Sequence, residues 1–212
     1  MKVLPLVVGN LSTNSYIVYD ENKKEGIIID PGDFPELLIS KIKELEINLK
    51  YIVFTHVHFD HILGYPKLKK EFPESLLIVS HIEKESLWDR EKSLLYYVDV
   101  DFPKITEFEE VKNGDLVEFG DVSLKVIETP GHTEGSICLY GENTLFSGDT
   151  LFYLSLGRWD FPGGDFYKEY HSITEVLFSL PNDTLVYPGH GNKTTIGYEK
   201  INNEVVKFKK TE

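Results

Sequence analysis

The chain has 212 residues, of which 41% are hydrophobic, and this is enough for one sizeable domain with its own core. It carries 35 acidic residues against 22 basic ones, so the formal net charge is -13. A surface with this charge repels phosphate backbones, which disfavours nucleic acid as a partner.

The cysteine content and the lengths of the apolar runs indicate the cellular compartment in which the protein is expected. The single cysteine, Cys138, excludes an internal disulfide, which is typical of a reducing compartment. The apolar run at residues 1–8 is too short for a signal peptide, and no run approaches the ~20 residues of a membrane span. We therefore expect a cytoplasmic protein without a membrane partner, folded as one domain over residues 1–212.

Short apolar runs rich in β-branched residues predict strands in the first half of the chain. These predicted strands are residues 2–8, 15–19, 26–29, 50–54 and 76–80. Helical periodicity at 36–45 predicts a helix, and a second helix is expected at 62–71. The charged and aromatic segment 82–103 is predicted to be a helix followed by a loop.

The second half of the chain repeats this order. Strands are predicted at residues 116–119, 123–128, 136–140, 144–147 and 184–187, and helices at 165–180 and 197–208. Strands followed by helices, twice over, favour two packed sheets with helices outside them.

A dense group of metal-type ligands follows the strand predicted at 50–54. Three histidines and one aspartate stand within six residues: His56, His58, Asp60 and His61. Imidazole and carboxylate groups both bind divalent metals such as zinc, iron and manganese. This group therefore predicts a metal site with room for more than one ion.

Three later segments share one form, in which an apolar strand and a small-residue turn precede a ligand: His132, Asp149 and His190. We expect His132 to complete a first site with His56 and His58, which alternate along an extended segment. His190 would complete a second site with Asp60 and His61, and the two oxygens of Asp149 suit a bridge between two ions.

The two remaining histidines are interpreted differently. His81 follows the strand predicted at 76–80, and a structural role is favoured over a place in the pocket. His171 lies in a charged helical segment and is expected on the surface.

The run from His56 to His61, with Pro-Gly-His132, Gly-Asp149 and Pro-Gly-His190 in that order, resembles the metallo-β-lactamase superfamily of hydrolases. The resemblance implies an α/β (α+β) fold, a four-layer αββα sandwich with the site along one sheet edge. It also implies two divalent metal ions, with zinc expected first and iron or manganese also accepted.

Segments 148–165 and 187–197 look like the glyoxalase II-like group, which hydrolyses thioesters such as hydroxyacylglutathione. The resemblance implies attack by a metal-bridging hydroxide, with Asp60 as a catalytic ligand and Arg158 binding a small-molecule thioester. Full-length glyoxalase II enzymes continue into a helical domain that binds glutathione, which this chain is expected to lack. Asp160 stands where those enzymes carry an aromatic residue, and Tyr153 and Leu154 replace a polar-Gly pair.

Two other interpretations stay open. Persulfide dioxygenases look similar in the same segments and use one iron, which His56, His132 and Asp149 would hold here. A non-enzymatic protein on the same fold is disfavoured, because no ligand of the pattern is missing.

Overall fold

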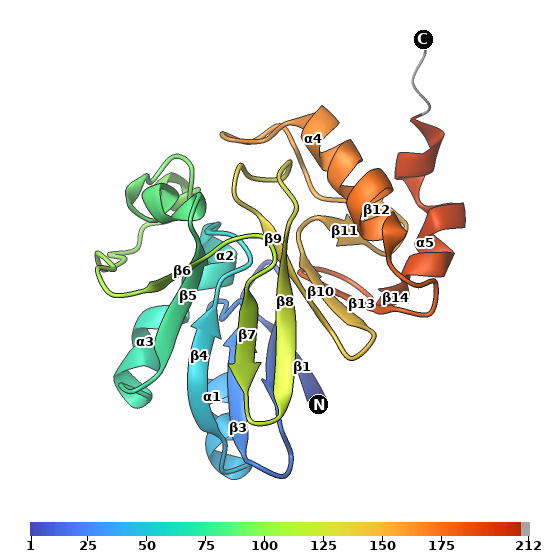
Figure 1. Cartoon of the computed structure of the whole chain (residues 1–212). Helices are drawn as coiled ribbons and strands as arrows, with labels where there is room; N and C mark the ends of the chain where they lie inside the picture. Colours follow the sequence, from blue (N-terminus) through green and yellow to red (C-terminus); the bar gives the residue numbers. More distant parts are fainter. Residues whose placement is uncertain (209–212) are drawn as a thin grey trace.

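The computed structural model describes residues 1–208, so residues 209–212 of the predicted domain lie outside the described part. Two six-stranded sheets and flanking helices make up this part of the chain (Figure 1). No helix within it is long and apolar enough to cross a membrane.

The first sheet has the order β1-β2-β3-β4-β5-β6. Its strands are β1 (Lys2–Val8), β2 (Thr13–Tyr19), β3 (Glu25–Ile29), β4 (Asn48–Val53), β5 (Leu76–Ser80) and β6 (Glu109–Val111). The pairs from β1 to β3 are antiparallel and those from β3 to β6 are parallel. Because β3 and β4 run parallel, the segments that follow them leave the same edge of the sheet.

The second sheet has the order β14-β13-β10-β9-β8-β7. Its strands are β7 (Leu116–Phe119), β8 (Val122–Glu128), β9 (Ile137–Gly141), β10 (Thr144–Gly148), β13 (Leu185–Pro188) and β14 (Thr194–Thr195). Among the described strand pairs of this second sheet, only β10–β13 is parallel, and it brings the ends of both strands to one edge. A separate short hairpin joins β11 (Leu151–Phe152) to β12 (Ser155–Leu156).

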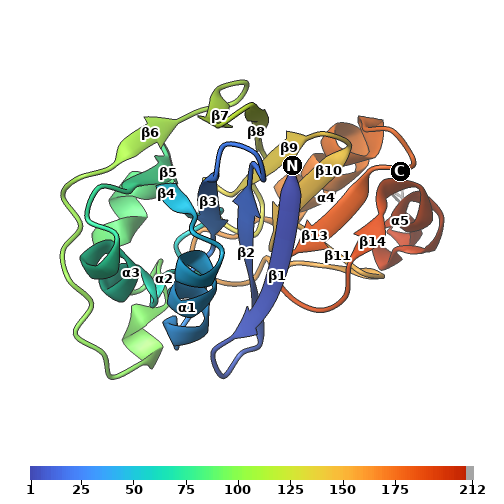
Figure 2. The ribbon, with the colours of Figure 1, turned by 90° about the horizontal axis from the view of Figure 1, so that it is seen from below.

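Three apolar clusters hold the layers together. The central cluster joins the facing sides of the two sheets, with side chains such as Ile27 from the first and Phe146 from the second. A second cluster packs the first sheet against α1 (Glu36–Glu44) and α3 (Tyr65–Glu71), and a third packs the second sheet against helices from the C-terminal quarter. Figure 2 shows α1 and α3 on the opposite side of the sheets from α4 (Phe166–His171) and α5 (Ile196–Asn202). The predicted αββα sandwich is therefore confirmed.

Several predicted elements differ from those observed. The single helix expected at 62–71 is two helices, α2 (Phe59–Ile62) and α3, because the Gly64 N–H donates to the Pro31 carbonyl at the bend between them. The segment 82–103 contains only two short 3-10 turns, Glu83–Trp88 and Leu95–Tyr97.

The two helices predicted near the C-terminus also change character along their length. The first begins as α4, capped by the Asp165 carboxylate, and continues through a π-helical turn at Ser172–Val176. The second is α5 followed by a 3-10 turn at Glu204–Lys207. The very short strands β6, β11, β12 and β14 were not predicted, because two or three residues carry too little periodicity.

Candidate metal centre

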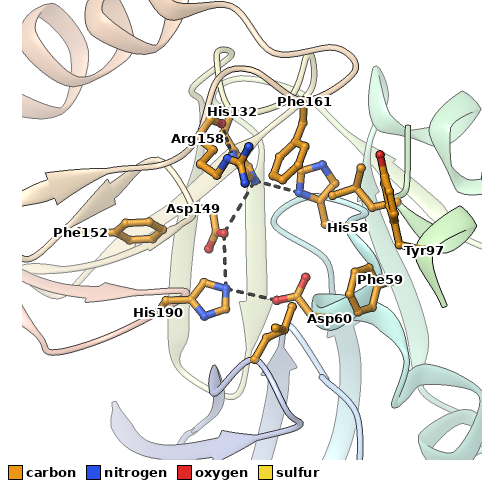
Figure 3. A pocket seen from close by; sticks show the side chains of 12 residues that line it. His58, Phe59, Asp60, Tyr97, His132, Asp149, Phe152, Arg158, Phe161 and His190 are labelled. Carbon is orange, nitrogen blue, oxygen red and sulfur yellow. Dashed lines mark hydrogen bonds and ion pairs between the residues drawn. The ribbon is translucent and has the colours of Figure 1, made fainter. Parts of the chain in front are cut away.

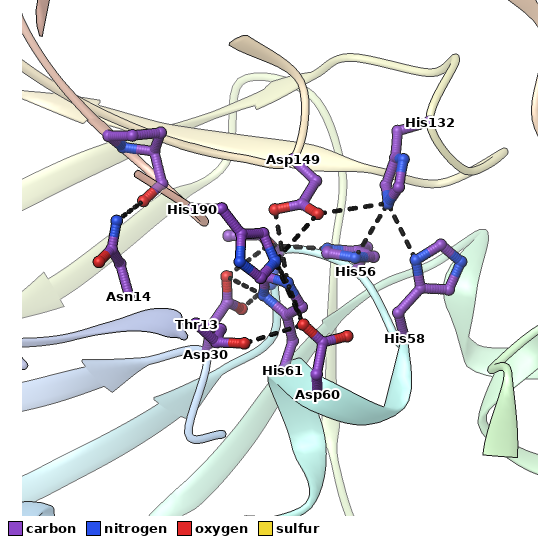
Figure 4. Close-up of polar contacts among 12 residues, drawn as sticks. Thr13, Asn14, Asp30, His56, His58, Asp60, His61, His132, Asp149 and His190 are labelled. Carbon is purple, nitrogen blue, oxygen red and sulfur yellow. Dashed lines mark hydrogen bonds and ion pairs between the residues drawn. The ribbon is translucent and has the colours of Figure 1, made fainter. Parts of the chain in front are cut away.

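All seven predicted ligands meet at one edge of the two sheets (Figure 4). They come from segments that follow four different strands. His56 and His58 follow β4, and Asp60 and His61 lie in α2 directly after them. The other three follow β8, β10 and β13: His132, Asp149 and His190.

The first ligand set is His56, His58 and His132, which are at most 3% exposed. The Nε2 atom of His132 lies 3.2 Å from Nε2 of His56 and 2.9 Å from Nδ1 of His58. Nitrogens bound to one tetrahedral zinc ion would lie about 3.3 Å apart, given Zn–N bonds of about 2.0–2.1 Å. Both distances are close to that value, and all three residues offer ligand atoms within 4.8 Å of one another, which is compatible with one shared ion.

Hydrogen bonds behind the rings assign the tautomers in this set. Nδ1 of His132 lies 2.6 Å from the Arg158 carbonyl oxygen, so that nitrogen carries the proton. The Thr55 hydroxyl donates to Asp30, which leaves its oxygen to accept from Nδ1 of His56 at 3.1 Å. The Nε2 atoms of His56 and His132 are therefore unprotonated, and their lone pairs face each other. A cation between them would stabilise this arrangement.

Burial keeps the first ligand set neutral. Desolvation, reinforced by neighbouring histidines, lowers the pKa of His56 well below its usual value and that of His58 to about 3. Desolvation also lowers the pKa of His132. Neutral imidazole is the form that binds metal, so these rings need lose no proton at neutral pH.

The second ligand set is Asp60, His61 and His190. The three ligand atoms lie 3.2–3.4 Å apart, counting Asp60 Oδ2 and the two Nε2 atoms. His61 is fully buried, but the His190 side chain is 26% exposed.

Charge distinguishes this set from the first. Burial opposes the ionisation of Asp60, but His61 and His190 outweigh it and lower the pKa of that carboxyl. Burial also opposes a charge on His61, yet Asp60, Asp149 and Asp30 raise its pKa well above the usual value. Against the effect of burial, the carboxylates raise the pKa of His190 in the same way. Without a metal, protonated histidines therefore offset the negative charge of the carboxylates in this set.

Asp149 lies between the two sets. Its Oδ2 is 3.7 Å from Nε2 of His132 and 3.5 Å from Nε2 of His190, and its Oδ1 is 3.4 Å from Nε2 of His61. Burial opposes its charge, but His61 and the other histidines lower its pKa to about 2. Within residues 1–208, its Oδ1 is buried without a hydrogen-bond partner, which marks a position for a ligand atom.

Several outer residues orient these ligands. The Asp30 carboxylate accepts from the backbone and hydroxyl of Thr55 and lies 3.0 Å from Nδ1 of His61. Buried Glu169 in α4 accepts from the His132 backbone N–H at 2.8 Å. Such partners set the direction and tautomer of metal-binding histidines.

A cavity of about 390 Å³ opens beside the cluster (Figure 3). His58, Asp60, His132, Asp149 and His190 reach it from one side. Its other walls are mainly apolar or aromatic: Leu11, Phe59, Leu94, Tyr97, Phe152 and Phe161. The ligand atoms therefore face a space whose apolar walls and few polar groups suit a small molecule.

The sequence profile of the metallo-beta-lactamase superfamily matches residues 8–190. The chain belongs to this superfamily. Two relatives cover most of it. Hydroxyacylglutathione hydrolase GloC from Haemophilus influenzae is 33% identical over 99% of this chain and 100% of its own length. Mitochondrial persulfide dioxygenase ETHE1 from Bos taurus is 30% identical over 84% of this chain and 63% of its own length.

Solved structures of superfamily members have the same fold. The crystal structure of BLEG-1 B3 metallo-beta-lactamase has a TM-score of 0.88 at 32% identity, covering 96% of this chain and 98% of that one. The crystal structure of TTHA1623 in a di-iron-bound form has a TM-score of 0.84 at 30% identity, covering 95% and 99%.

The other predicted residues have separate places in this superfamily fold. Arg158 lines the cavity, but both Nε and one terminal nitrogen donate to Asp160 at 2.9 Å. Its guanidinium also lies 4.1 Å from the centre of the Phe161 ring. His81 is half exposed beside Glu128 and does not line the cavity, and His171 is exposed.

Sequence reasoning missed the outer residues Asp30 and Glu169. Asp30 could have been found, because Asp-Pro-Gly after β3 has the same strand, turn and ligand form as the later motifs. Glu169 gave no such signal, since it stands in a charged helix and its partner is 37 residues away. Contacts of this kind appear only once the layers are packed.

Proposed function

We propose that this protein is a metal-dependent hydrolase that holds two divalent ions and cleaves a small-molecule thioester such as hydroxyacylglutathione. The observation that carries the proposal is the pair of ligand sets joined by Asp149 at the side of an aromatic cavity. The full-length similarity to hydroxyacylglutathione hydrolase GloC supports the choice of substrate.

In this proposal the first ligand set would hold one ion and the second ligand set would hold the other, and Asp149 lies close enough to contribute to either. Zinc fits these nitrogen and oxygen donors, and iron or manganese would also be accepted. Bound there, the ions would supply an activated water and polarise the substrate carbonyl.

Asp60 is assigned the catalytic role among the side chains. It is ionised, it lines the cavity, and its Oδ2 is already engaged by Thr13 and His190. Oδ1 therefore remains to accept a hydrogen bond from the attacking water and hold it toward the substrate. No side chain need protonate the leaving group, because a thiol with a pKa of about 8.5 departs as the anion.

The cavity walls exclude water and bind the rest of the substrate. Phe59, Phe152 and Phe161 supply apolar surface beside the ligands. Arg158 is proposed to bind a substrate carboxylate through the terminal nitrogen that Asp160 does not use.

One observation favours a second function, a persulfide dioxygenase with one iron. Nε2 of His132 lies 3.2 Å from Nε2 of His56 and 3.7 Å from Asp149 Oδ2. Two imidazoles and one carboxylate are the ligands of many non-haem iron oxygenases. Similarity to persulfide dioxygenase ETHE1 points the same way.

One experiment separates the two functions. The metal-loaded protein is incubated with hydroxyacylglutathione under anaerobic conditions, and free thiol is measured with time. We expect thiol release that does not depend on oxygen. Oxygen uptake with glutathione persulfide, without anaerobic thioester cleavage, would instead support the dioxygenase.

A further inference from the structure

The start of β2 contacts two of the three members of the second ligand set, Asp60 and His190 (Figure 4). The buried Thr13 hydroxyl donates to Asp60 Oδ2 at 2.8 Å. The Thr13 backbone also forms an antiparallel bridge with His190. One residue near the N-terminus therefore contacts two ligands that come from opposite halves of the chain.

Asn14 continues this contact along the loop that carries His190. Its side-chain amide donates to the Pro188 and Gly191 carbonyls, both at 2.9 Å, and its backbone N–H donates to Gly189 at 2.7 Å. The Tyr16 hydroxyl donates to the Pro188 carbonyl as well. Three backbone carbonyls on the two sides of His190 thus accept hydrogen bonds from β2.

The His190 loop needs this support. Glycines stand on both sides of His190, and Gly191 has a φ of +76°, so the local backbone has little rigidity of its own. Within residues 1–208, no side chain of β2 hydrogen-bonds directly to a ligand of the first set. The His56 ring contacts Thr55, the His132 ring contacts the Arg158 carbonyl, and the His132 backbone N–H donates to Glu169.

We infer that Thr13 and Asn14 are positioning residues that set the affinity of the second ligand set for its ion, independently of the first. This inference rests on the proposed two-ion centre. Thr13 directs the Asp60 carboxylate, and Asn14 holds the loop that presents His190. Loss of an outer partner of a metal ligand costs roughly 10–100-fold in metal affinity.

The test is a metal-loading experiment on the full chain. The metal-free wild type, Thr13→Val and Thr13→Ser are each titrated with Zn²⁺ in the presence of a competing chelator. The affinity of each bound equivalent is measured by calorimetry. Valine keeps the shape and removes the hydroxyl, whereas serine keeps the hydroxyl. We expect Thr13→Val to lower the Zn²⁺ affinity of the second ligand set roughly 10–100-fold. The Zn²⁺ affinity of the first ligand set should change less than about twofold. Thr13→Ser restores both values.

Thr184→Val is the matched control. Thr184 is also buried and donates its hydroxyl to a side-chain oxygen, that of Asn143 at 3.0 Å, but it lies directly before β13, at the end of that strand away from His190. It should leave both equivalents unchanged. Asn14→Ala should reproduce the loss at the second equivalent alone.

The outcomes separate this inference from the proposed function. Two equivalents in wild type with unchanged affinities in Thr13→Val would overturn the inference and leave the two-ion centre standing. Equal weakening of both equivalents would overturn it too, because it would indicate a general structural role. A single equivalent in wild type would overturn both.

Discussion

The two ligand sets lie side by side and differ in how they are built. The first is buried and neutral, and it is held partly by backbone groups such as the Arg158 carbonyl. The second contains a carboxylate, is partly exposed at His190, and depends on side chains from β2. One part of the cluster is thus a buried set of neutral imidazoles, whereas the other part relies on charge and on contacts from β2.

Replacing the residue shared by both sets should have the largest effect. Asp149→Ala removes the carboxylate between them and leaves their histidines facing one another without its charge. We expect metal affinity at both positions and thioester turnover to fall by about 100-fold or more. Elemental analysis and the thiol-release assay measure the two effects.

Asp121→Ala is the control and should change neither quantity, because this exposed residue directly precedes β8, at the end of that strand opposite His132. Full turnover by metal-depleted Asp149→Ala protein would contradict the two-ion account.

A substitution next to His132 should weaken metal binding mainly at the first ligand set. A Cβ on Gly157 would lie 1.8 Å from the Asp149 carbonyl oxygen, so Gly157→Ala must displace the loop whose Arg158 carbonyl binds His132. We expect the Zn²⁺ affinity of the first ligand set to fall roughly 10–100-fold, and that of the second ligand set to fall less. The same calorimetric loading measures both.

Gly114→Ala is its control, because a Cβ there would meet no atom within 4 Å. It should leave metal binding unchanged even if the positive φ of Gly114 makes the variant less stable. Loss of affinity in both glycine variants would argue against a specific role for the Gly157 loop.

Metal affinity should depend on pH at the second ligand set and much less at the first, because the two sets differ in charge. The raised pKa values of His61 and His190 mean that these rings keep their protons above pH 6.5, and an ion must displace them. Affinity at the second position should therefore rise with pH above 6.5, by about tenfold per unit for each proton released.

The first position should change little over the same range, because the pKa values of His56, His58 and His132 are lowered and the rings are already neutral. Loading at pH 6.5 and pH 8.0 provides the comparison. Parallel pH slopes at the two positions would contradict it.

The smallest effect is expected at the cavity mouth, outside both sets. Asp160→Asn keeps the shape of the side chain but removes its charge and one of the two oxygens that accept from Arg158, so one nitrogen of the guanidinium becomes free for a substrate carboxylate. Since exposed ion pairs are weak, KM for an anionic thioester should fall only about two- to fivefold. A neutral thioester should show no change, and an equal change for both substrates would remove Arg158 from the binding site.

Much of this organisation could be predicted from the sequence. The ligands from His56 to His190 stand directly after strands whose apolar runs are local features, and β1, β5 and β7 have the predicted bounds. The helix expected at 62–71 failed because its break depends on a bond from Gly64 to distant Pro31.

The outer contacts could not be predicted for a related reason. The bond from Thr13 to Asp60 spans 47 residues and that from Asn14 to Pro188 spans 174. Periodicity reports which face of an element is buried, but it does not report which polar group lies opposite. The ligands are encoded locally, whereas their supports arise from the packing of the two sheets.

The central claim is that this chain holds two ions that serve hydrolysis. The most direct test is metal content per chain, by elemental analysis, on protein whose anaerobic thioester hydrolysis is measured in the same preparation. The account predicts two equivalents, with thiol release lost when either is removed. Full hydrolytic activity at one equivalent, or one tightly bound iron with activity only in the presence of oxygen, would contradict it.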